Sequence, residues 1–232
     1  MELQAPKSPV PVFPLPNLVL FPHAVVPLHV FELRYRTMVR EALSSERMIA
    51  MGLLKPGWER DYHGSPEFYP LGCLARFEEV EWLPNDCYSL VVRGTARVTF
   101  GRVVREYPYR VARVEVVPQE PYSEDDPLVL SEKHVMLELY RKLTASAVGE
   151  ESGGGSPLPR GASSASAAGL AGSDLSFEEL VNSVCMTLDT EPIEKLHLLG
   201  LDSVLERGHL VRGIAAKRMR TRPQPPPGGE HN

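Results

Sequence analysis

Apolar and polar residues alternate over several short stretches between residues 10 and 118. In the clearest case, residues 71–83, one face of an extended chain would carry Cys73, Ala75 and Phe77. The other stretches of this kind are 87–94, 95–106 and 109–118, and residues typical of turns separate them. Period-two patterning in consecutive short segments predicts an antiparallel sheet or a small barrel.

The most apolar stretch of the chain, residues 13–39, contains the four prolines Pro14, Pro16, Pro22 and Pro27. Proline has no N–H for a strand ladder, so strand pieces here are expected at a sheet edge, a bulge or a barrel rim. The uncharged part spans only 14 positions, 18–31, whereas a membrane-spanning helix needs about 20 apolar residues. Only Lys7 precedes it as a basic residue, so a signal peptide is not expected either.

The spacing then changes to three and four residues over 31–43, which predicts a helix. Its apolar face would carry Phe31, Tyr35, Met38 and Leu43. Glu32 falls in the predicted first turn, where the helix dipole favours a negative charge.

After residue 118 the pattern becomes helical, with Pro127 beginning the first helix. Ser176 and Glu179 have the spacing of a capping box, which predicts a helix start at 176. In the segment 144–173, 23 of the 30 residues are Gly, Ser, Ala or Pro, which predicts a flexible linker. The plan is α+β: a β-rich subdomain at 10–118, a helical subdomain at 119–220 and a disordered tail at 221–232.

The charge of the chain is uneven. The 232 residues carry a net charge of -5, which argues against nucleic-acid binding over the whole surface. Residues 203–222, however, hold six Lys or Arg and one Glu, a local charge of +5. A basic helix could meet nucleic acid or an acidic partner, or it could be a solvated face, and the sequence leaves both open.

No motif for catalysis, metal or cofactor binding is present. The sequence contains no GxxxxGK[ST], HExxH, CxxC or GxSxG pattern. His29 and Glu32 are three residues apart, but a packed histidine beside a helix-capping acid explains them better than a metal site does. Three widely spaced cysteines indicate reduced thiols, and we therefore expect a cytoplasmic protein without metal or cofactor.

One loop-like segment, residues 55–72, is rich in aromatic side chains. The candidate partner-binding residues in it are Trp58, Tyr62, His63, Phe68 and Tyr69. Rigid rings in a surface loop give large contact area at low entropic cost, which is typical of recognition sites. Alternatively, Trp58 and Phe68 could fold back and cover the barrel.

The stretch FPLPNLVLFPHAVVPLHVFELRYRTMV resembles the opening signature of the LON domain, the N-terminal substrate-binding domain of Lon proteases. The residues that carry the resemblance are Pro14, Leu15, Phe21, Pro22, Pro27, Phe31, Glu32, Arg34, Tyr35, Gly72, Gly94 and Arg97. The match runs from about residue 10 to 118, and more loosely to about 215. The segment 54–58 is similar to stand-alone bacterial members of the family.

The resemblance implies a PUA-like β-barrel, or pseudobarrel, followed by a helical bundle. It also implies a non-catalytic module, because the ATPase and Ser–Lys protease domains of full Lon proteases are not found in this sequence. The partners expected are unfolded or degron-bearing protein segments, with a protease as a further partner and a role as an adaptor in protein quality control. The alternatives are RNA binding through the basic helix and a small-ligand barrel with its pocket by the 55–72 loop.

Overall fold

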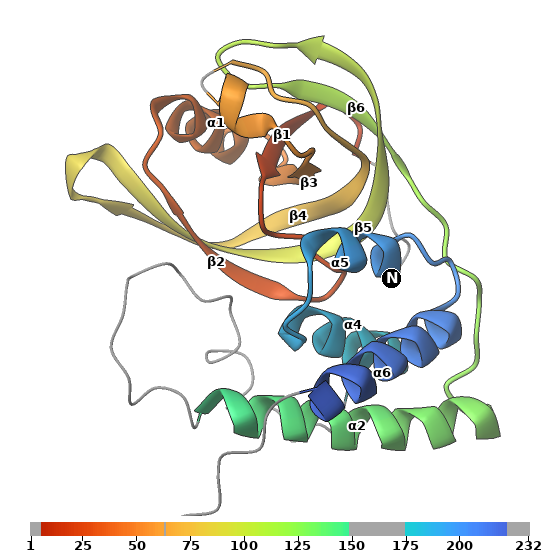
Figure 1. Ribbon diagram of the computed structural model, residues 1–232. Helices are drawn as coiled ribbons and strands as arrows, with labels where there is room; N and C mark the ends of the chain where they lie inside the picture. The colour runs from red at the N-terminus through yellow and green to blue at the C-terminus, as the bar shows by residue number, and fades with distance from the viewer. Residues whose placement is uncertain (1–5, 63, 149–174, 222–232) are drawn as a thin grey trace, which may run out of the picture.

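The computed structural model describes residues 6–62, 64–148 and 175–221 of the chain. Within these residues a β-rich half and a helical half lie against each other (Figure 1). The strands lie between residues 10 and 116, and the later helices between residues 127 and 221. The predicted α+β order, a β-rich unit with one inserted helix followed by a helical unit, is confirmed.

The described strands form one mixed sheet. They are β1 (Val10–Leu15), β2 (Val25–Val30), β3 (Met48–Leu54), β4 (Phe68–Leu83), β5 (Cys87–Arg105) and β6 (Val111–Val116). Their order is β2-β5-β4-β3-β1-β6, and β6 also pairs with β5, so that five strands follow one another around a barrel-like ring. The antiparallel pairing or small barrel predicted from residues 71–118 agrees with β4, β5 and β6, which pair antiparallel, whereas β1 and β3 are parallel. The connection between them passes through β2 and a helix, the kind of crossover that parallel pairing requires.

Helix α1 (Leu33–Leu43) is the inserted helix, and it packs against the sheet through the buried side chains of Tyr35, Met38, Val39 and Ala42. The helix begins two residues later than predicted, because Glu32 has an extended backbone and is the N-cap. Phe31 therefore lies outside the helical periodicity. The expectation that it belongs to the apolar face is wrong, and its side chain is 61% exposed.

Strand β2 shows how the chain accommodates a proline. β2 pairs with β5 from Val25↔Arg93 to Val30↔Tyr88, and the Gly94 N–H donates to the Ala24 carbonyl just before it. In an antiparallel pair every second residue turns its backbone toward the partner strand. That alternation turns the backbone of Pro27 away from β5, so the missing N–H removes no bond from the sheet.

The helical half consists of α2 (Pro127–Val148), α4 (Phe177–Thr187), α5 (Pro192–Leu199) and α6 (Val204–Thr221). The capping box is confirmed: Ser176 Oγ accepts from the Glu179 N–H, and a Glu179 carboxylate oxygen accepts from the Ser176 N–H. Helix α2 continues to Val148, which corrects the predicted linker start at 144. Most of the predicted linker (149–173) and tail (222–232) lie outside the described residues.

Two buried arginines join the halves. Arg97 of β5, 3% exposed, donates to the carbonyl oxygens of Leu199 (3.1 Å) and Leu201 (2.8 Å), at and after the end of α5. It also reaches the Pro118 carbonyl and the Asp202 carboxylate. Arg207 of α6 is fully buried and donates to Asn182 Oδ1. Asn182 in turn donates to the Pro22 carbonyl of the barrel half.

Candidate functional site

The aromatic loop predicted to bind a partner is tied to the start of α1. Its short 3-10 helix, η1 (Trp58–Asp61), is followed by Tyr62, and the Trp58 and Tyr62 rings lie 5.5 Å apart between centroids. Arg34 of α1 donates to the carbonyl oxygens of Tyr62 (2.8 Å) and Gly64 (3.1 Å). Both rings are half-buried. Arg34, a signature residue, therefore ties the described part of this loop to α1.

Glu32 completes this attachment. The Tyr62 hydroxyl donates to Glu32 Oε1 at 2.7 Å, and the Arg34 guanidinium pairs with Glu32 Oε2 at 3.0 Å. The hydrogen bond to the carboxylate raises the pKa of Tyr62 to about 12, with burial adding to the effect. The Arg34 guanidinium also lies over the rings of Tyr35 and Tyr62, 4.7 and 5.5 Å from their centroids.

The other predicted aromatics point elsewhere. Phe68 stacks edge-on against Phe100, with the Arg110 guanidinium 4.6 Å from its ring centroid. Tyr69 packs against the core of the helical half. His63 lies outside the described residues. The structure therefore brings the Trp58 and Tyr62 rings together, whereas Phe68 and Tyr69 have other packing partners.

The remaining signature residues have structural positions. Pro14 and Leu15 belong to β1 and pair with β3. Phe21 is fully buried among helical-half residues, and its neighbour Pro22 accepts the Asn182 bond already described. Gly72 and Gly94 allow close strand contacts, since an added Cβ would lie 2.3 Å from the Met51 oxygen and 2.1 Å from the Phe21 oxygen respectively.

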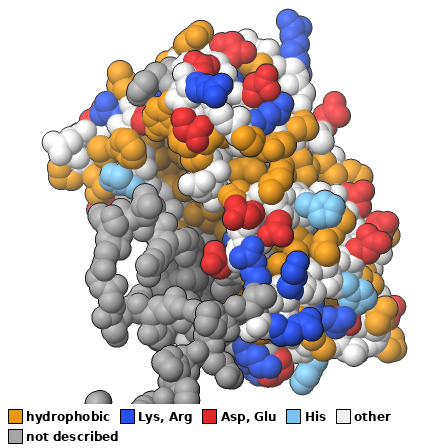
Figure 2. Space-filling model, viewed as in Figure 1, with side chains coloured by type: hydrophobic (Ala, Val, Ile, Leu, Met, Phe, Trp, Pro, Cys, Tyr) orange, Lys and Arg blue, Asp and Glu red, His pale blue; other side chains and the backbone are white. Residues whose placement is uncertain are grey.

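The barrel half has an apolar surface where the β4–β5 hairpin projects from the molecule (Figure 1). We call Phe31, Leu33 and Trp82 the distal patch; their side chains are 61%, 69% and 70% exposed. Figure 2 shows hydrophobic side chains on this face of the barrel half, interspersed with charged and other side chains. Val30, Tyr88 and Trp82 lie in one register row across β2, β5 and β4, whereas the Phe31 ring stacks with His29, 6.1 Å apart between centroids, so Phe31 and Trp82 flank the end of β2 from different sides.

A carboxylate clamp holds the hairpin tip against α1 beside this patch. Asp86 accepts hydrogen bonds from Arg36 at 2.9 Å, from Arg40 at 3.1 Å and from the Trp82 indole N–H at 3.2 Å. Leu33 lies one turn before Arg36 on the same helix. The clamp therefore holds the Trp82 indole near the first turns of α1, where Leu33 lies. Both side chains remain exposed to solvent.

The barrel order, the signature positions and the helical half agree with one family. A model described as the ATP-dependent protease La (LON) substrate-binding domain matches residues 9–217. The chain belongs to this family. The predicted resemblance to LON domains is confirmed.

Individual relatives of this LON-family chain are full-length proteases. Lon protease 2 of Myxococcus xanthus is 34% identical over 115 residues, which are 50% of this chain and 14% of that protein. The Lon protease of Anaeromyxobacter dehalogenans is 32% identical over 143 residues, which are 59% of this chain and 17% of that protein. The chain thus spans less than a fifth of the length of these relatives.

Solved structures of LON domains share the fold. The N-terminal domain of the Mycobacterium avium complex Lon protease has a TM-score of 0.61 and 16% identity, with 90% of this chain and 98% of that one covered. The Xanthomonas campestris Lon N-terminal domain has a TM-score of 0.60 and 21% identity, covering 89% and 98%.

Two of the three thiols of this LON-family chain are not poised for reaction. All three cysteines are free, and Cys73 and Cys185 are fully buried. Burial raises the pKa of both thiols to about 12, so neither forms a thiolate near neutral pH. Within residues 6–62, 64–148 and 175–221, no group of three or more His, Cys, Asp or Glu could hold a metal ion. None of the helices in these ranges has the length and apolar character that a membrane crossing requires.

The small-ligand pocket by the 55–72 loop and the basic helix are the two alternative sites. The hollow beside the aromatic loop, lined by Arg34, Tyr35 and Arg110 among others, has a volume of about 10 Å³, which is room for about one water molecule. In the basic helix, Arg207 is buried, Arg212 pairs with Glu132 and Arg218 pairs with Glu194. Three of the six basic residues at 203–222 therefore have partners within the helical half.

Sequence reasoning missed the distal patch. Leu33 and Trp82 do not stand out in the sequence, because each belongs to an element that also carries buried apolar residues. The available signal was Trp82 in the run EEVEWL, where a tryptophan follows three acidic residues near a turn. A large ring among solvated charges is more typical of a surface than of a core.

Proposed function

We propose that this chain is a non-catalytic module that binds exposed or unfolded segments of other proteins through the distal patch. The observation that carries the proposal is the exposure of Phe31, Leu33 and Trp82, which lie after β2, at the start of α1 and near the end of β4. Large apolar side chains that remain exposed together mark interaction sites. The family description, a substrate-binding domain, supports the same function.

The chemistry of the patch suggests which segments it takes. An unfolded chain exposes apolar side chains that a folded protein buries, and a surface with an indole and a phenyl ring binds such side chains without a shaped pocket. The Asp86 clamp lowers the entropic cost of binding, because Trp82 is already held in place. Degron-bearing segments, a partner protease, an adaptor role and a cytoplasmic setting belong to this proposal as well.

The test compares a triple variant of the patch with a double variant elsewhere on the barrel half, both made in the full chain. Phe31→Ser, Leu33→Ser and Trp82→Ser together should weaken binding of a permanently unfolded, fluorescently labelled protein by about tenfold or more, since each lost anchor of this kind is worth about 1 kcal/mol or more. Fluorescence anisotropy at fixed salt measures the affinity.

The matched control is Val104→Ser with Tyr107→Ser, which removes apolar groups that are 47% and 71% exposed at a different turn of the barrel half. This variant should bind as the parent does. Equal losses in both variants, or none in the triple variant, would contradict the proposal. A Trp58→Ala, Tyr62→Ala variant tests the aromatic loop, and a loss confined to that variant would move the site there.

A further inference from the structure

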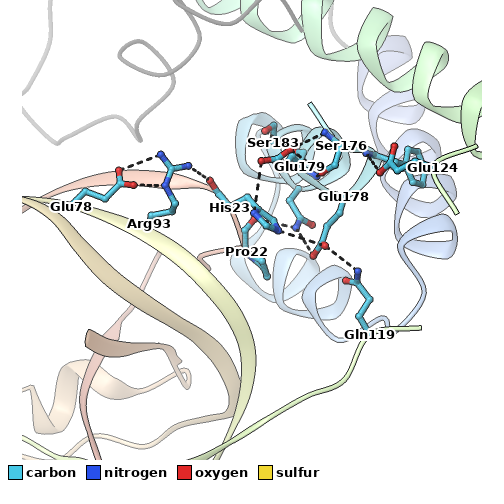
Figure 3. A network of polar contacts seen from close by, with 12 residues as sticks. Pro22, His23, Glu78, Arg93, Gln119, Glu124, Ser176, Glu178, Glu179 and Ser183 are labelled. Atoms are coloured by element: carbon cyan, nitrogen blue, oxygen red, sulfur yellow. Dashed lines mark hydrogen bonds and ion pairs between the residues drawn. The ribbon is translucent and has the colours of Figure 1, made fainter. Parts of the chain in front are cut away.

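His23 lies in the connection between β1 and β2, where the barrel half meets α4 (Figure 3). Its N–H donates to the Gly94 carbonyl at 2.8 Å, and its carbonyl accepts from Arg93 Nη1 at 3.0 Å. Its φ is 67°, in the left-handed region. The backbone of His23 is thus tied to β5 on both its N–H and its carbonyl side.

The imidazole faces two carboxylates at the start of α4. Nε2 lies 3.6 Å from Glu178 Oε2, and Nδ1 lies 3.9 Å from Glu179 Oε1. The His23 side chain is 42% exposed, so it can exchange protons with solvent. A protonated imidazole therefore forms an ion pair that joins the barrel half to the first turn of α4.

Other elements contribute charged and polar groups to this junction. Arg93 of β5 opposes protonation of His23, but it also pairs with Glu78 of β4. Gln119, after β6, donates to Glu178 Oε2 at 3.0 Å. The positive charge of Arg207 on α6 also stabilises the Glu178 carboxylate. The hydrogen bond to Glu178 outweighs burial and Arg93, and the pKa of His23 is raised above its ordinary value of 6.5.

We propose that His23 is a pH-sensitive latch that fastens the first turn of α4 to the barrel half when it is protonated. Because the folded pKa of His23 is raised, its stabilising contribution is complete below about pH 6.5 and is lost as the pH rises through the folded value. The hydrogen bond from His23 contributes to lowering the pKa of Glu178 against the effect of its burial. The Glu178 contribution is therefore lost only as the pH falls below about 4.5, and the latch is strongest between these limits.

The first-turn amides of α4 report on the latch. The Phe177 N–H donates to Glu124 Oε1 at 2.8 Å, and the Glu178 N–H donates to the Tyr122 hydroxyl at 3.2 Å. These bonds depend on where the turn sits relative to the segment before α2. The later part of α4 is held by its buried core, so the change should be local.

Hydrogen exchange of the full chain at about pH 5.5 and about pH 8, corrected for intrinsic exchange, tests the proposal. Amides of residues 177–180 should be about two- to fivefold better protected at the lower pH, the range for one partly exposed ion pair. His23→Asn, which tolerates a left-handed backbone, should abolish this difference. His197→Asn, at an exposed position of α5, should leave it unchanged.

Glu178→Gln provides a second, independent variant that keeps the histidine. It should also abolish the pH difference, and it should return the His23 pKa, measured by NMR titration, toward 6.5. Equal protection at both pH values in the parent chain would overturn the latch. Persistence of the difference in both His23→Asn and Glu178→Gln would overturn it too. None of these outcomes depends on partner binding.

Discussion

Gly94 and Gly213 show that one residue type can have opposite roles in this molecule. A Cβ on Gly94 would lie 2.1 Å from the Phe21 carbonyl oxygen, which belongs to the backbone and cannot move aside freely. A Cβ on Gly213, on the exposed side of α6, would meet nothing within 4 Å. The first glycine is needed for close contact, and the second only loosens a helix.

Gly94→Ala should lower the free energy of unfolding by about 1 to 3 kcal/mol, because the strand and the Phe21 loop must separate to admit a methyl group. Gly213→Ala should raise it by about 0.5 to 1 kcal/mol, the gain in helix propensity. Urea unfolding followed by circular dichroism measures both. A Gly94→Ala chain at least as stable as the parent would show that the strand and the Phe21 loop can accommodate a methyl group.

Among the elements, α4 has the most complete local signal for its own start. Ser176 and Glu179 exchange both capping bonds, and a carboxylate from Glu124 adds a third bond to the same turn. The capping bonds were predictable because they depend on residues three apart. The bond from Glu124, 53 residues away in the chain, was not.

Ser176→Ala should therefore cost about 1 kcal/mol of stability, since it removes the acceptor for the Glu179 N–H. Ser183→Ala is the matched control in the same helix, because its hydroxyl only donates back to the Glu179 carbonyl. This control should change stability by less than about 0.5 kcal/mol. Thermal unfolding compares the two, and a larger loss at Ser183 would contradict the assignment of the cap.

The sheet was predictable as strands but only partly as an arrangement. Alternation located β4 and β5 because one face of each is buried, as Cys73, Ala75 and Phe77 are. The parallel pairing of β1 and β3 depends on a crossover through 32 intervening residues, which no local pattern encodes. The exposure of Phe31 was missed for a related reason, since only the N-cap conformation at Glu32 ends the periodicity there.

At the scale of the whole molecule, the halves are joined by polar groups inside an apolar boundary. Arg97 donates to acceptors from two segments of the chain, residue 118 and residues 199–202, and its Asp202 partner is 59% exposed. The sequence identified Arg97 as a signature residue, but its role needed the position of α5. The distal patch was likewise invisible, because exposure depends on what the helices leave uncovered.

Arg97→Met should lower the free energy of unfolding by about 2 to 4 kcal/mol, because hydrogen bonds from a charged donor contribute about 1.5 to 3 kcal/mol each and the remaining carbonyls stay poorly hydrated. Asp202→Asn should change it by less than about 1 kcal/mol, since that carboxylate faces water. Urea titration measures both. A parent-like Arg97→Met would show that the halves are joined by apolar contacts alone.

Pro27 has a consequence for strand pairing at the edge of β2. If the proposed function holds, extended segments come close to β2, which is an edge strand among the described residues. An edge with a complete set of outward donors and acceptors would allow such a segment to continue the sheet and start a fibril-like stack. At Pro27 the outward donor is missing, so the ladder is broken at its middle. Under the proposed function, this break predicts that the chain binds unfolded segments without adding them to its own sheet.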